Sequence, residues 1–137
     1  MRWPRYGYSF PLRLIWSRHE AYVCPLLLPG GWDPATGTIH TEINAQIDQV
    51  FENVDLNLKH AGGKGWSQVF RVNSYHVPLN NEALGAMSRN FKKWMPDHKP
   101  IWTVLGVARL GEDDMRVEIE VVAHDPEGTE SAKGTSA

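Results

Sequence analysis

Apolar residues recur along this chain with two different periods, and the longest helical pattern lies between residues 42 and 61. Its apolar positions are mostly three or four residues apart and so share one face of a helix: Ile43, Ile47, Val50, Phe51, Val54 and Leu58. Thr41 is suited to cap the helix N-terminus, and Gly62 and Gly63 are suited to end the helix. The sequence therefore predicts one amphipathic helix here.

A second helical stripe is formed by Leu84, Met87, Phe91 and Trp94. This helix is expected to begin near Asn80 or Asn81 and to stop before Pro96, because proline cannot continue a helix. Between the two helices, residues 67–77 are rich in β-branched and aromatic side chains and predict a strand that Pro78 ends.

The clearest alternating pattern lies in residues 99–124, where two β-rich runs flank a polar turn at residues 111–114. Such a pattern is typical of a hairpin. In the second run, one face carries Met115, Val117, Ile119, Val121 and Ala123, and the other carries Arg116, Glu118, Glu120, Val122 and His124. The two glutamates on one face repel each other, so this face is either plain solvent-exposed surface or part of a ligand site.

The two ends of the chain are less regular. Residues 6–16 and 21–28 read as strands that prolines interrupt, and prolines confine strands to edges or bulges. Residues 125–137 contain no large apolar side chain and are expected to form a disordered tail. With 137 residues in all, the sequence predicts a single domain over residues 1–124.

The order of these elements predicts an α+β fold, in which two helices lie on one face of a mixed sheet. The other face of the sheet then carries Glu118, Glu120 and Val122, and the chain has no second pair of helices to cover it. Either water or another subunit covers this face, and Val122 among the charged residues favours a subunit contact.

Composition narrows the function classes. The chain is 42% hydrophobic and 22% charged, as in globular proteins, and its net charge of −2 gives no reason to expect nucleic acid or an anionic membrane as a partner. The single cysteine forms no internal disulfide, which fits a reducing compartment. Four arginines precede the first acidic residue, as in mitochondrial presequences, but prolines interrupt this segment. The expected location is the cytoplasm, with the mitochondrion as the alternative.

Several motifs were weighed against simpler structural roles. Residues 62–66 are glycine-rich but follow a helix and precede a strand, which indicates a helix end rather than a phosphate loop. The six histidines lack metal-ligand spacing, so no metal and no cofactor are expected. Two interpretations of Glu118 and Glu120 stay open. They form a solvated strand face, or one of them is an acid–base group whose pKa partial burial raises.

From Gly30 to His124 the chain resembles the RidA/YjgF family, also known as the L-PSP endoribonuclease family, and a fungal-type branch of it. The resemblance rests on residues 33–37, 46–54, 61–62, 106–110 and 117–123, together with Pro100; residues 31–34, 74–77 and 94–98 are similar to the fungal-type branch. It implies a chorismate-mutase-like α+β sandwich, a homotrimer, and ligand clefts between subunits. Residues 1–29 match the family pattern poorly.

The resemblance also implies a chemistry and a set of site residues. Typical members hydrolyse enamines and imines, which pyridoxal-phosphate enzymes form from amino acids, to keto acids and ammonia. Glu118 matches the water-positioning glutamate, and Tyr8 matches a tyrosine that lines the cleft. Trp102 stands where the family has an arginine that grips the substrate carboxylate. An indole offers one uncharged N–H in place of a charged fork of donors, so this loss would weaken carboxylate binding by about 2–5 kcal/mol.

Three functions follow from these observations. The first is a hydrolytic deaminase for small reactive imines or enamines, with a substrate that lacks a carboxylate and a cleft lined by Tyr8, Trp102 and Glu118. The second is a non-catalytic trimeric module that binds a small metabolite, which the missing arginine favours. The third, endoribonuclease activity, rests on the family name alone, and the charge balance argues against it.

Overall fold

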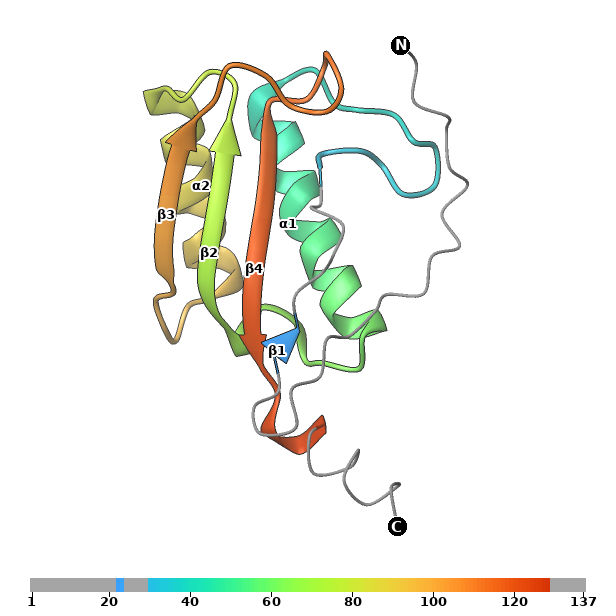
Figure 1. Ribbon diagram of the computed structural model, residues 1–137, viewed down its shortest axis with the longest axis vertical. Helices are drawn as coiled ribbons and strands as arrows, with labels where there is room; N and C mark the ends of the chain where they lie inside the picture. The colour runs from blue at the N-terminus through green and yellow to red at the C-terminus, as the bar shows by residue number, and fades with distance from the viewer. Residues whose placement is uncertain (1–21, 24–29, 129–137) are drawn as a thin grey trace.

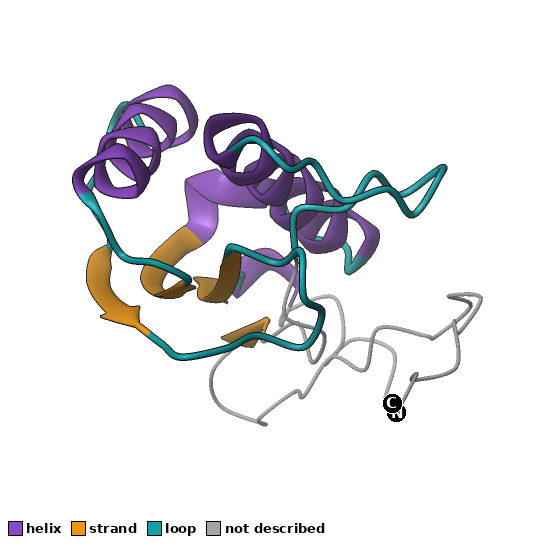
Figure 2. Ribbon diagram, turned by 90° about the horizontal axis from the view of Figure 1, so that it is seen from above, coloured by secondary structure: helices purple, strands orange, loops and turns teal. Residues whose placement is uncertain are grey.

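The computed structural model describes residues 22–23 and 30–128 (Figure 1). Along the chain these form β1 (Tyr22–Val23), α1 (Ile43–His60), the 3-10 helix η1 (Gly65–Gln68), β2 (Val69–His76), α2 (Asn81–Trp94), β3 (Ile101–Gly106) and β4 (Val117–His124). The strands form one sheet in the order β1-β4-β2-β3, and both helices pack on the same face of it (Figure 2). The predicted α+β class, with two helices on one face of a mixed sheet, is confirmed.

The pairing of the strands corrects one sequence-based prediction. Strand β2 is parallel to β3 and antiparallel to β4, and it lies between them, so residues 99–124 do not form a hairpin. The chain leaves β2, crosses the sheet as α2 and returns as β3, and such a crossover is the connection that parallel neighbours require. A polar turn between two strands shows only that the chain changes direction, and it does not identify the partner of either strand.

The hydrophobic core lies between the helices and the sheet. The alternating face of β4 is buried there through Val117, Ile119 and Val121, as its pattern predicts. A row of aromatic rings crosses the same layer. Phe51 of α1 stacks on Trp66 with 4.6 Å between ring centroids and meets Phe91 of α2 edge-on at 5.4 Å.

Capping explains where the helices begin and end. The carboxylate of Glu42 accepts the backbone N–H groups of Asn44 and Ala45 at 2.9 and 2.8 Å, so Glu42 and not Thr41 caps α1. Asn80 caps α2 as predicted, and its side chain accepts the N–H of Ala83 at 2.9 Å. Gly62, with φ of 92°, ends the turn after α1, which confirms the role predicted for the glycine-rich residues 62–66.

The described structure continues past the predicted end of the domain at residue 124. Asp125 is buried, and its carboxylate accepts hydrogen bonds from Gln68 Nε2 and the Gly128 N–H, both at 3.2 Å. Residues 125–128 therefore belong with the fold, because a short polar segment can be held by hydrogen bonds without apolar side chains. None of the helices in the described part of the chain has the length and apolar character needed to cross a membrane.

Candidate functional site

The face of the sheet turned away from the helices, called the open face below, combines acidic, polar and apolar side chains. Strand pairing aligns them in three rows across β4, β2 and β3: Glu118, Tyr75 and Leu105; then Glu120, Asn73 and Thr103; then Val122, Arg71 and Ile101. Ile101 and Leu105 are 66% and 49% exposed, which is unusual for large apolar residues on a sheet face.

Glu118 is the partly buried acid of the open face. Its backbone pairs with Gly30, so the loop that precedes α1 lies beside it. Burial raises the pKa of the Glu118 carboxyl above its usual range, and within the described residues this carboxyl has no hydrogen-bond partner. A carboxyl group that is partly shielded from water, unpaired and more easily protonated is suited to proton transfer.

Glu120 has a different environment, although it lies only two residues away. Its Oε2 accepts hydrogen bonds from the Tyr75 hydroxyl at 3.3 Å and from Asn73 Nδ2 at 3.4 Å. Burial, and then the charge of Glu120, raise the pKa of Tyr75, so the phenol keeps its proton and remains a donor at neutral pH. The two glutamates therefore differ: Glu120 is held by hydrogen bonds from Tyr75 and Asn73, and Glu118 has no such bond among the described residues.

Tyr75 and Asn73 were not predicted as site residues. The signal was nevertheless present in the sequence, because residues 71, 73 and 75 alternate with the buried residues 72, 74 and 76 of the same strand. This alternation places Asn73 and Tyr75 on the open face once β2 is known to pair with β4.

Trp102 and Glu118, both expected to line the cleft, do not share a face of the sheet. Trp102 pairs with Val72 and lies on the helix side of the sheet, where its ring meets Phe91 edge-on at 4.9 Å. Within one chain, Trp102 and Glu118 lie on opposite faces of the sheet.

The indole of Trp102 belongs to a small polar cluster inside the core. Its N–H donates to Ser74 Oγ at 2.9 Å, and Ser74 Oγ lies 3.0 Å from His76 Nε2. Ser74 and His76 are fully buried. Desolvation lowers the pKa of His76 to about 4, so its imidazole is neutral at pH 7.

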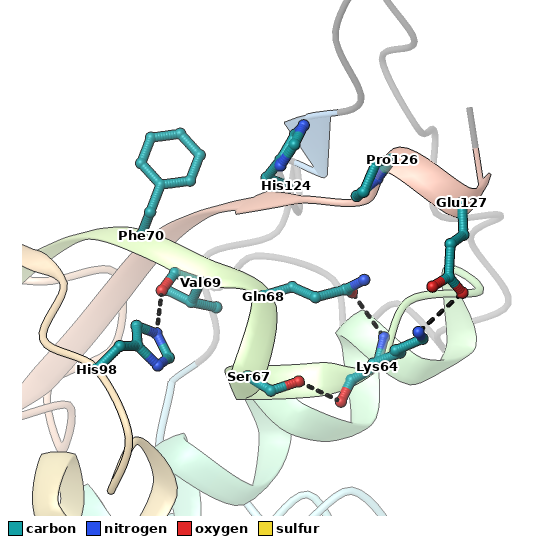
Figure 3. Close-up of a pocket in the computed structure, with 9 residues that line it drawn as sticks. All are labelled: Lys64, Ser67, Gln68, Val69, Phe70, His98, His124, Pro126 and Glu127. Carbon is teal, nitrogen blue, oxygen red and sulfur yellow. Dashed lines mark hydrogen bonds and ion pairs between the residues drawn. The ribbon is translucent and has the colours of Figure 1, made fainter. Parts of the chain in front are cut away.

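A separate cavity of about 590 Å³ opens at the other end of the sheet, beside the start of β2 and the end of β4 (Figure 3). The ammonium of Lys64 and the carboxylate of Glu127 form an ion pair there at 2.8 Å, and His98 Nε2 donates to the Val69 carbonyl at 2.7 Å. His124, which lines this cavity, is six residues along β4 from Glu118, a separation of about 20 Å. This cavity is therefore distinct from the surroundings of Glu118.

Two further predictions concern Tyr8 and metal binding. Tyr8 lies outside the described residues. Among the residues that the structure does describe, no three histidine, cysteine, aspartate or glutamate side chains come together as a metal site would require.

The chain is similar to known proteins in both sequence and structure. A family model described as Endoribonuclease L-PSP matches residues 28–125. A comparison with curated proteins gives no match.

Solved structures share the fold. RidA from an Antarctic Psychrobacter is 25% identical, with a TM-score of 0.68 over 76% of this chain and 80% of its own. The YjgF gene product of E. coli is 21% identical, with a TM-score of 0.64 over 75% and 80% of the two chains. A Yersinia pestis protein of the conserved Rid family, YyfB, is 21% identical, with a TM-score of 0.66 over 76% and 78%. Since the family model covers well over half of the sequence, the chain belongs to the Endoribonuclease L-PSP family, in which the RidA and YjgF proteins are found.

Proposed function

We propose that this protein hydrolyses small reactive imines or enamines to carbonyl compounds and ammonia, at clefts between the subunits of a homotrimer. The observation that carries the proposal is Glu118, an unpaired and partly buried carboxyl with a raised pKa on a sheet face that no other described element covers. Family membership supports the same reaction class. The cytoplasm is the proposed location, with the mitochondrion as the alternative.

The proposed reaction adds water across the C=N bond. As the water oxygen bonds to the carbon of the protonated imine, Glu118 accepts one proton of that water, and the C=N π electrons move to the nitrogen, which becomes a neutral amine. Glu118 then gives this proton to the nitrogen, the C–N bond breaks with its electron pair leaving on ammonia, and the hydroxyl proton passes to the Glu118 carboxylate as the carbonyl forms. Water and imine are consumed in equal amounts, and no other reactant is needed. A carboxyl with a raised pKa suits both steps because it exchanges a proton closer to neutral pH.

The proposed cleft draws on two copies of the chain. Trp102 and Glu118 lie on opposite faces of one sheet, so both can line one cleft only if they come from different subunits. The exposed Ile101 and Leu105 support association, since large apolar side chains on a sheet face are usually covered by a partner. Tyr8 is the third proposed cleft residue.

The test is ammonia release from freshly generated imines by the purified protein and its Glu118→Ala and Glu118→Gln variants. We expect both variants to lose at least about 100-fold in rate, the usual contribution of a general acid–base group. Glu52→Gln is the matched control, because Glu52 is an exposed glutamate on α1, and this variant should keep full activity. An unchanged rate in Glu118→Ala would refute the mechanism.

The alternative function, a non-catalytic metabolite-binding module, predicts a different result in the same assay. The wild-type protein would then bind imine-derived carbonyl compounds without accelerating ammonia release. Trp102 supports this alternative, because it is an uncharged side chain at the position where the resemblance implies a carboxylate-binding arginine. Ribonuclease activity is disfavoured, because Glu118 and Glu120 place negative charge on the open face, where it would repel phosphates.

A further inference from the structure

The buried cluster of Ser74, His76 and Trp102 is unusual because it places three polar groups inside an apolar layer. Its neighbours are the core residues of the two helices and the ring of Phe91. Polar groups in such a layer are tolerated only when they satisfy one another. The Trp102 N–H and Ser74 Oγ meet this condition at 2.9 Å.

The direction of the hydrogen bonds follows from the need to satisfy the serine hydroxyl, because the Trp102 N–H can only donate to Ser74 Oγ. A neutral imidazole has one acceptor nitrogen, and Nε2 is the nitrogen within reach of Ser74 at 3.0 Å. The arrangement that satisfies the serine hydroxyl completely runs from the Trp102 N–H to Ser74 Oγ, and from the Ser74 O–H to His76 Nε2. Ser74 is thus the link between an indole at the sheet edge and an imidazole in the core.

We propose that Ser74 is a positioning residue that holds Trp102 in this orientation and thereby sets the ligand class of the cleft, which is imines that carry no carboxylate. The inference rests on the proposed function, in which Trp102 lines the cleft. Trp102 is only partly buried and lies on β3, the edge strand of the sheet, so part of its ring is accessible from the side.

The lack of positive charge around Trp102 makes the site selective for imines that carry no carboxylate. A ligand carboxylate placed beside Trp102 would find neither a free indole N–H nor a positive charge, because Ser74 already accepts the indole N–H and His76 is neutral. Such a carboxylate would lose its hydration without compensation. An uncharged aromatic or aliphatic imine loses little on entering the same site and gains contact with the fixed indole ring.

A matched pair of substitutions tests the role of the hydroxyl. Ser74→Thr keeps the hydroxyl and Ser74→Val removes it, while threonine and valine have nearly the same shape. Two substrates differ only by a carboxylate: benzaldimine, formed from benzylamine by a flavin amine oxidase, and 2-imino-2-phenylacetate, formed from phenylglycine by an amino-acid oxidase. For each variant, kcat/KM for both imines is measured from ammonia release and compared with the uncatalysed rate.

A spectroscopic readout follows the proposed contact directly. The indole N–H resonance of Trp102 is assigned by its loss in Trp102→Phe, and its shift reports the bond to residue 74. We expect the wild type and Ser74→Thr to share this shift and to prefer benzaldimine. In Ser74→Val the resonance should move upfield and the preference should fall by roughly 2- to 10-fold, the range expected for one hydrogen bond.

Two results would overturn the inference. One is a displaced indole resonance in Ser74→Val with an unchanged preference between the imines, which would make the bond merely structural. The other is an equal loss of preference in the Thr and Val variants. If the wild type hydrolyses neither imine, the proposed function fails, and the inference is then decided by titration with the two products. Binding of benzaldehyde in preference to phenylglyoxylate at the Trp102 resonance supports it, and the absence of that preference refutes it.

Discussion

The two faces of the sheet are built from alternate residues of the same strands, yet they treat polar groups differently. On the helix side, Ser74 and His76 are fully buried, and each polar contact there is between neutral groups. On the open face, Glu118 and Glu120 keep part of their contact with water and can remain charged. The comparison teaches that the buried cluster of Ser74, His76 and Trp102 holds its groups neutral, whereas a half-covered face can hold the charge that proton transfer needs.

The largest expected effect is a difference in the free energy of unfolding between alanine variants on the two faces of the sheet. Ile119→Ala removes a fully buried side chain from the helix side of β4 and should lower the free energy of unfolding by about 2–5 kcal/mol. Leu105→Ala, on the open face, should lower it by less than about 1 kcal/mol in dilute protein. Urea unfolding measures both values.

The Leu105 variant also reports on association. If another subunit covers the open face, the effect of Leu105→Ala should grow with protein concentration, because association stabilises only the folded chain. A loss for Leu105→Ala as large as that for Ile119→Ala, at every concentration, would mean that the two faces are equally buried and would break the comparison.

The next effect concerns pH and the buried imidazole. The pKa of His76 is about 4 in the folded protein, against an ordinary value of 6.5, so the unfolded chain binds the proton more strongly. The stability that His76 contributes is complete above pH 6.5 and is lost as the pH falls towards 4, by about 3 kcal/mol in total. The raised pKa of Glu118 acts in the opposite direction, since protonation of that carboxyl favours the folded state.

This pH dependence is measured by urea unfolding between pH 4 and 7 in the wild type and in His76→Gln. The wild type should lose stability more steeply over this range, because glutamine does not titrate. His40→Gln is the control, since His40 is exposed, and it should follow the wild type. Parallel profiles for the wild type and His76→Gln would show that the imidazole is protonated as easily in the folded chain as in the unfolded one.

The two faces also explain how much the sequence could predict. Periodicity identified α1, α2 and the alternating face of β4, because local burial imposes these patterns on neighbouring residues. The partner of β3 was not predictable in the same way, since strand pairing depends on contacts between distant residues and on the α2 crossover.

The candidate site was predictable to a similar extent. Glu118 was identified from its position in an alternating strand and from the family resemblance. Asn73 and Tyr75 were not, because their contacts with Glu120 cross from β2 to β4. The cluster of Ser74, His76 and Trp102 likewise joins two strands, and no spacing along the chain indicates a contact between residues 74 and 102.

The smallest expected effect sharpens the comparison at Glu118 itself. Burial raises its pKa, so the ionised carboxyl slightly destabilises the folded protein at neutral pH. Glu118→Gln keeps the shape and removes the charge, and we expect its melting temperature at pH 7 to equal or slightly exceed that of the wild type. The difference should vanish as the pH falls and the wild-type carboxyl becomes protonated.

Differential scanning fluorimetry across pH 4–7 measures this difference, with Glu112→Gln as the control at an exposed loop position. A clear loss of stability in Glu118→Gln would indicate that the carboxylate makes a stabilising contact and would contradict its description as a free acid. A variant that is inactive and at least as stable would instead show that Glu118 is retained for chemistry, because the fold gains nothing from a charge that burial disfavours.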